Sequence, residues 1–238
     1  MLIDLLVYVN ETPGTYSIPE VTKAAAERGL DGIILVCQSR PLSPSEVPKT
    51  SELKTFVGVE LVTEQGVVLL VPSETNGAYA NKVWGEPGPD GAYVLEQVLS
   101  AALEHRWAVV AVQPFDQHFP NSSGEQLISA EGIHAVIVTT GGTPLLAHDL
   151  ALEAAMARNI PIVAGSNTRQ SFNRLGSVAT VFCREISSQK ELCSAIIDGD
   201  IWTATIGGKT QFSAAKTPSS KPHDKGNRNR GRGRDKRR

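Results

Sequence analysis

Strand and helix signals alternate along most of this chain, and the alternation constrains its fold more than any other feature of the sequence. Residues 2–9 form a nearly continuous apolar run, which is typical of a strand buried on both faces. A helix is predicted after it, with Ser17 as its cap, Pro19 in its first turn and Gly29 at its end. The buried strand 32–37 comes next. Units of this kind build parallel sheets.

The same pattern continues over the rest of the chain. Further strands are predicted at 56–62, 67–71, 107–112, 134–139, 161–164 and 178–182, and helices at 92–106, 126–130, 145–158 and 187–197. Residues 63–66 are predicted to form a hairpin-like turn, and residues 39–53 and 72–91 are predicted to be loops. Strands that are mostly followed by helices favour one α/β barrel. An open doubly wound sheet is the alternative, although no G-x-G-x-x-G follows the first strand.

Length and composition exclude several classes of protein. The chain has 238 residues, 41% of them hydrophobic, which is enough for one large core. It contains no apolar run of about 18 residues, and Asp4 interrupts an N-terminus that lacks a basic stretch. We therefore expect neither a membrane span nor a signal peptide. Three cysteines without a CxxC pair favour reduced thiols in a cytoplasmic protein.

The net charge of −2 conceals an uneven distribution. The segment 216–238 contains 10 Lys and Arg and 2 acids, whereas the rest of the chain contains 13 Lys and Arg and 23 acids. The composition changes near Ser213, and no apolar residue follows Pro222. Such a segment cannot bury enough surface to offset the entropy of ordering. We predict a folded domain over 1–212 and a disordered basic tail over 213–238.

The tail carries the candidate nucleic-acid-binding side chains. These are Arg228, Arg230, Arg232, Arg234, Lys236, Arg237 and Arg238. Flexible guanidinium groups suit phosphate backbones, those of single-stranded RNA in particular, and such binding depends strongly on salt. No aromatic side chain is interleaved with them, so we expect no sequence specificity. The alternative roles are solubilisation and contact with the acidic body.

Several predicted strands end in polar or reactive side chains. In either α/β architecture the functional site lies at the C-terminal ends of the strands. The residues at these ends are Leu6, Tyr8, Cys37, Gln38, Glu60, Gln113, Asn167 and Arg169.

Five segments, in the same order, resemble the PHP (polymerase and histidinol phosphatase) family. Residues 3–8 stand where the family has a strand ending in His-x-His, and residues 29–38 resemble a stretch ending in Thr-Asp-His. Residues 58–60 match Gly-x-Glu, residues 112–115 resemble Ala-His-Pro-Phe, and residues 163–169 resemble Gly-Ser-Asp-Ala-His. The resemblance implies a distorted, parallel (β/α)7-type TIM-like barrel. It also implies up to three divalent metals and hydrolysis of phosphoesters by a metal-activated water.

Most of the metal ligands that the resemblance implies are replaced in this chain. Neutral side chains that bind zinc or manganese poorly stand at Tyr8, Gln38, Gln113 and Asn167. Apolar side chains stand at Leu6 and at Val67 or Val68. Cys37 replaces a carboxylate, Arg169 brings a positive charge, and only Glu60 is kept. We predict a vestigial site without catalytic residues, metal or cofactor.

Some of these residues have two interpretations. Glu60 and Arg169 form either an ion pair at the barrel mouth or a polar pocket in which Arg169 binds an anion without turnover. Cys37 is either a core cysteine or a nucleophile whose pKa Arg169 lowers. Asp116 and His118 are candidate ligands of a rearranged metal site, and a solvated loop histidine is the alternative. The other histidines have no partner at ligand spacing.

Two functions follow from these observations. The first is a catalytically degenerate PHP-like domain that acts as a binding or scaffold protein and associates with RNA or another nucleic acid through its tail. Non-catalytic PHP-like barrels occur in RNA-processing ribonucleoproteins, which supports this by analogy. The alternative is a metal-dependent phosphoesterase or nuclease with a rearranged site around Glu60, Asp116, His118 and Cys37. The sequence does not identify a protein partner.

Overall fold

A computed structural model describes residues 1–9, 16–43, 45–47 and 53–206. The compact unit runs from Met1 to Gly207, and the predicted tail over 213–238, with its candidate arginines, lies outside the described residues. In the part of the chain that is described, no helix has the length and apolar character needed to cross a bilayer.

Strands and helices alternate largely as predicted. The strands are β1 (Leu2–Tyr8), β2 (Gly32–Gln38), β3 (Lys54–Thr63), β4 (Gly66–Val71), β5 (Ala108–Val112), β6 (Ala135–Thr139), β7 (Ile162–Ala164), β8 (Val178–Phe182) and β9 (Ile201–Thr205). The helices are α1 (Ile18–Glu27), α2 (Leu95–His105), α3 (Glu125–Ser129), α4 (Leu145–Ala157) and α5 (Gln189–Asp198), with a 3-10 turn at Phe172–Arg174.

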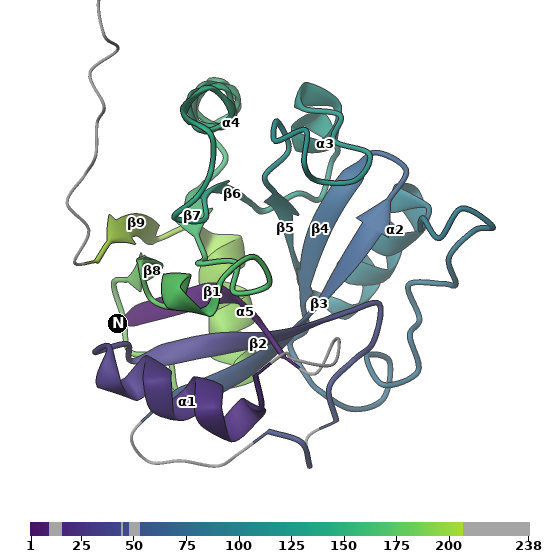
Figure 1. The fold of residues 1–238 in the computed structure, drawn as a ribbon. Coiled ribbons are helices and arrows are strands. Elements are labelled where there is room, and N and C mark those ends of the chain that lie inside the picture. Colours follow the sequence, from purple (N-terminus) through teal and green to yellow (C-terminus); the bar gives the residue numbers. More distant parts are fainter. Residues whose placement is uncertain (10–15, 44, 48–52, 207–238) are drawn as a thin grey trace, which may run out of the picture. The chain divides into compact units, whose positions relative to one another are not determined.

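The nine strands form one sheet in the order β7-β6-β5-β4-β3-β2-β1-β8-β9 (Figure 1). β7 also packs against β8 and β9, so the sheet nearly closes. The predicted α/β barrel is therefore confirmed, but its sheet is mixed. The 63–66 turn makes β4 antiparallel to β3 and β5, and β8 runs antiparallel to β1 and β9.

The barrel has an inner and an outer core because successive side chains of a strand point to opposite faces. The inner core includes Ile34 and Val110, whereas the outer core holds the buried faces of α1, α2 and α4. α5 packs its Leu192 into the inner core. The Gln189 side chain hydrogen-bonds both backbone groups of Val57, near the start of β3. α5 therefore closes the end of the barrel opposite the C-terminal ends of its parallel strands.

Side chains that cap the first turn explain where α1 and α2 begin. The predicted cap of α1 is confirmed, because Ser17 and Glu20 form a reciprocal capping box. α2 begins at Leu95, later than predicted. Its first free amide donates to the Glu64 carboxylate, at 2.8 and 3.1 Å, so the cap comes from the hairpin turn and not from a residue next to the helix.

Two other segments differ from the sequence expectation. β9 was not predicted, and it pairs antiparallel with β8 over its whole length. The 72–91 segment is not regular structure, as expected, but it is anchored to the outer core. Its Tyr79 and Trp84 are fully buried, with ring centroids 6.2 and 6.1 Å from that of Trp107.

Candidate functional site

A bulge in β1 directs two consecutive side chains toward the inside of the barrel. The register with β2 shifts between Asp4 and Val7, so Leu5 and Leu6 both belong to the inner core. A bulge adds a residue to one strand and re-aims the side chains after it. Tyr8 consequently also faces inward.

The loop after β7 is tied to β1 by hydrogen bonds. The amide of Ser166 donates to Asp4 Oδ1 at 2.7 Å, and the amide of Tyr8 donates to Thr168 Oγ1 at 2.8 Å. Gly165 allows this approach, because a Cβ there would lie 2.6 Å from Leu6 Cβ and from Leu6 N. We call residues 165–169 the β7 loop. Its attachment to β1 places Arg169 over the end of that strand.

Tyr8, Glu60 and Arg169 meet at this point. Arg169 Nη1 lies 2.8 Å from Glu60 Oε1, and the Tyr8 hydroxyl donates to Glu60 Oε2. The Arg169 guanidinium also stacks on the Tyr8 ring, with Cζ 3.8 Å from the ring centroid. Glu60 is 1% exposed, so this buried carboxylate has one hydrogen-bonded partner on each oxygen. Glu60 and Arg169 thus form an ion pair, as the first of the two interpretations expects.

Gln113 and Asn167 follow β5 and β7 with the left-handed backbone that non-glycine residues rarely adopt, at φ +46° and +51°. Both side chains are buried. Gln113 Nε2 donates to the Ile137 carbonyl at 3.1 Å. Among the described residues, Gln113 Oε1 and Asn167 Oδ1 have no hydrogen-bond partner. Unpaired buried acceptors are costly, and left-handed backbone is concentrated at functional sites.

Asp4 is a buried carboxylate that the sequence analysis did not assign to the site. It accepts hydrogen bonds from the amides of Leu6, Ser166 and Gly176, at 3.2, 2.7 and 3.0 Å. Burial raises the pKa of Asp4 above its usual value, against the effect of these bonds. The sequence signal was an acidic residue inside an apolar strand. Through these hydrogen bonds Asp4 links β1 to the segments that follow β7.

Cys37 lies away from the inward-facing residues. It belongs to the outer core, its Sγ lies 3.2 Å from the Val9 carbonyl, and the guanidinium that reaches it, at 3.7 Å, is that of Arg40. The structure thus supports the core-cysteine interpretation of Cys37. Gln38, which is paired in register with Glu60, is exposed at the end of β2.

Asp116 and His118 form a hydrogen-bonded pair in the loop after β5. His118 Nδ1 lies 2.7 Å from Asp116 Oδ1, and the His118 amide donates to the same oxygen at 3.0 Å. Asp116 is buried, whereas the His118 side chain is 78% exposed. They line a recess shared with α4, and Glu60 does not line it. Within the described residues, no three His, Cys, Asp or Glu side chains are grouped as a metal site would require.

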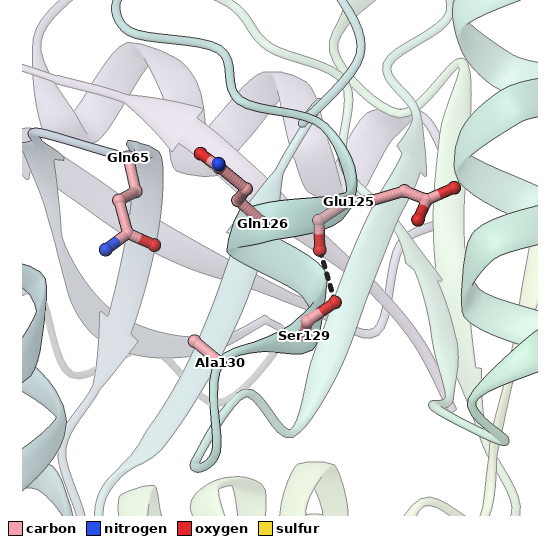
Figure 2. Close-up of a pocket in the computed structure, with 5 residues that line it drawn as sticks. All are labelled: Gln65, Glu125, Gln126, Ser129 and Ala130. Atoms are coloured by element: carbon pink, nitrogen blue, oxygen red, sulfur yellow. Dashed lines mark hydrogen bonds between the residues drawn. The ribbon is translucent and has the colours of Figure 1, made fainter.

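Another recess, of about 670 Å³, lies beside α3 (Figure 2). Gln65 and Gln126 present neutral amides to it, and the Glu125 side chain extends away from them. The Ser129 hydroxyl donates to the Glu125 carbonyl at 2.6 Å. Among the described residues, those that line this recess include no group of three potential metal ligands.

Comparison with known proteins supports the fold. By sequence, no protein family and no curated protein match the chain. By structure, it is similar to PsfC from Pseudomonas syringae PB-5123, with a TM-score of 0.66, 15% identity and coverage of 87% of this chain and 91% of that one.

Two further structures are similar. One is a two-domain protein from Bacteroides vulgatus ATCC 8482 that contains a predicted PHP-like metal-dependent phosphoesterase, with a TM-score of 0.59, 11% identity and coverage of 87% of this chain and 65% of that one. The other, from Bifidobacterium adolescentis ATCC 15703, is provisionally described as a metal-dependent phosphoesterase; its TM-score is 0.56, with 15% identity and coverage of 69% of this chain and 86% of that one. The described body therefore has the fold of a PHP-like, TIM-type α/β barrel.

Proposed function

We propose that this chain is a catalytically degenerate PHP-like domain that acts by binding, and that it associates with RNA or another polyanion through its basic C-terminal segment. The observation that carries the first part is the engagement of both Glu60 oxygens by Tyr8 and Arg169. Three free thiols agree with a cytoplasmic protein.

The residues at the strand ends do not fit a divalent metal. A metal site needs several imidazole, thiolate or carboxylate donors with free electron pairs. Among the strand-end residues that the sequence analysis named, all of which the structure describes, Glu60 supplies the carboxylate; it is already paired with Arg169 and accepts a hydrogen bond from the Tyr8 hydroxyl. Leu6 faces the same interior without a donor atom. The guanidinium supplies the positive charge that a metal would otherwise bring to Glu60. This favours a binding role for the domain over metal-dependent hydrolysis.

The competing function is a metal-dependent phosphoesterase or nuclease with a rearranged site. The similar structures described as metal-dependent phosphoesterases favour it, as does the Asp116–His118 pair.

Hydrolysis of bis(p-nitrophenyl) phosphate with added Mn²⁺ separates the two functions. We expect the full chain and its Glu60→Gln and His118→Ala variants to hydrolyse the ester no faster than buffer with Mn²⁺ does. Hydrolysis that requires Mn²⁺ and is abolished by Glu60→Gln would contradict the binding function.

The tail is tested by RNA binding across salt concentrations. Neutralising Arg230 and Arg232 to Gln in the full chain should weaken binding to single-stranded RNA. It should also lower the slope of log affinity against log salt by about 0.7 for each lost phosphate contact. Lys23→Gln with Lys190→Gln removes the same charge from exposed positions of the body and is the matched control. If the two double variants change RNA affinity and its salt dependence equally, the tail has no specific role in RNA binding and that part of the proposal is wrong.

A further inference from the structure

Helix α4 exposes more large apolar surface than a helix covering a barrel usually does. Four of its side chains are between 38% and 71% exposed: Leu145, Leu146, Leu150 and Met156. Its opposite side already packs alanines, among them Ala151 and Ala155, against the barrel. A helix that is apolar on both sides is normally covered on both. Contiguous exposed apolar surface marks an interaction site.

A recess of about 310 Å³ continues this surface between α4 and the loop after β5. Leu146, Leu150, Phe115 and Pro144 contribute apolar walls, and Asp116 and His118 stand among its polar residues. It is open to solvent and has room for a large apolar side chain. Interfaces commonly gain most of their affinity from one such anchor in a desolvated pocket.

The charges on the exposed side of α4 are acidic. Asp149 and Glu153 lie one helical turn apart, both are exposed, and α4 contains no Lys or Arg. Within the described part of the chain neither forms an ion pair. The nearest following cation, Arg158, pairs with Glu125 at 3.6 Å, and Figure 2 shows Glu125 extending away from its own recess. The negative charge of this surface therefore favours a basic partner.

We propose that α4 is a docking surface for a basic amphipathic helix of another protein. We call this surface the α4 face: Leu145, Leu146, Asp149, Leu150, Glu153 and Met156. The apolar stripe of the partner covers the leucines and places one side chain in the recess, while its Lys or Arg residues pair with Asp149 and Glu153. A second copy of this chain would oppose acid to acid, and nucleic acid would meet the same repulsion. The inference does not depend on the proposed function of the strand-end site.

The probe is a synthetic amphipathic helix of Leu and Lys, and a Leu–Glu helix of the same pattern is its matched control. We expect the full chain to bind the Leu–Lys helix and to bind the Leu–Glu helix far less. Leu146→Ser with Leu150→Ser should weaken binding by about tenfold or more, because the buried apolar contact is lost. Leu103→Ser changes a leucine of α2 that is 81% exposed, outside the α4 face, and should leave the affinity unchanged.

Asp149→Asn with Glu153→Gln keeps every apolar contact and tests the charges separately. It should weaken binding severalfold and reduce its salt dependence. This variant carries the test if the double leucine variant melts below the wild type. Equal affinity of the wild type and the α4 variants would overturn the proposal. So would sedimentation showing that the full chain dimerises through Leu146 and Leu150, since the occupant would then be a second copy.

Discussion

Glu60 is a carboxylate inside an apolar barrel, and Arg169 is the cation that balances it. Arg169→Gln removes that charge and leaves the carboxylate buried. We expect unfolding free energy to fall by about 1–3 kcal/mol, less than for a wholly buried pair because the arginine side chain is 35% exposed. Urea unfolding measures it. The control is Glu60→Gln with Arg169→Gln, which should be more stable than Arg169→Gln alone. The opposite order would contradict the pairing.

His134, the residue before β6, gives the second prediction at this scale. Its Nδ1 accepts the Val109 amide at 3.1 Å, and burial lowers the pKa of His134 below 6.5. The unfolded chain then takes up a proton at a higher pH than the folded chain does. Stability from this group is therefore lost as pH falls through 6.5 toward the folded pKa. His134→Asn keeps an acceptor without titrating, so unfolding free energy should vary less between about pH 7 and pH 5. An unchanged pH profile would contradict this.

Residue types at strand ends were predictable, but their contacts were only partly so. The sequence could suggest a pair of Glu60 and Arg169 because the strand that carries Glu60 and the strand that precedes Arg169 both end at one mouth of a barrel. The contact of the Tyr8 hydroxyl with Glu60 depends on the β1 bulge, and two of the three amides that bind Asp4 come from distant segments, at Ser166 and Gly176. Cys37 points to the outer core because it alternates with the inward-facing Val36. Neither a bulge nor a side-chain direction after it follows from residue type alone.

At the scale of elements, the contact between β1 and the β7 loop positions Arg169. Gly165→Ala would place a Cβ against the backbone and side chain of Leu6 and push the β7 loop away from β1. We expect a cost of about 1–3 kcal/mol, as for other overpacked sites. Gly142→Ala is the matched control, because the atoms nearest to its Cβ would be those at the far end of the Arg174 side chain, which can move aside more easily than backbone. Thermal melting should rank Gly165→Ala well below Gly142→Ala, and equal melting temperatures would contradict the contact.

The start of a helix could be predicted where its capping residue is adjacent in the sequence. The Ser17 cap fixed the start of α1, whereas α2 began late because its cap, Glu64, lies in the preceding hairpin. β9 was not predicted because it has only five residues and its Trp202 is exposed. It forms a strand because it pairs with β8. Such long-range pairings set the direction of β8 and make the sheet mixed.

At the scale of the whole molecule, a barrel of PHP-like fold carries mostly neutral or apolar side chains where the resemblance to the PHP family implies metal ligands. The order of strands and helices, with the five matching segments, is enough to predict the barrel from the sequence alone. The sequence predicted a helix at 145–158, but it did not show which of its leucines the barrel would leave exposed. We propose a binding function for the body and polyanion contact for the basic segment, whose charge is opposite to that of the body.

The metal content of the full chain tests the central claim most directly. The protein is purified without chelator, equilibrated with Mn²⁺ or Zn²⁺, freed of loosely held ions by gel filtration and measured by inductively coupled plasma mass spectrometry. Arg169 and Tyr8 already bind the two carboxylate oxygens of Glu60. We therefore predict far less than one ion per chain, and the same value for Glu60→Gln. One or more ions per wild-type chain, lost in Glu60→Gln, would contradict the account.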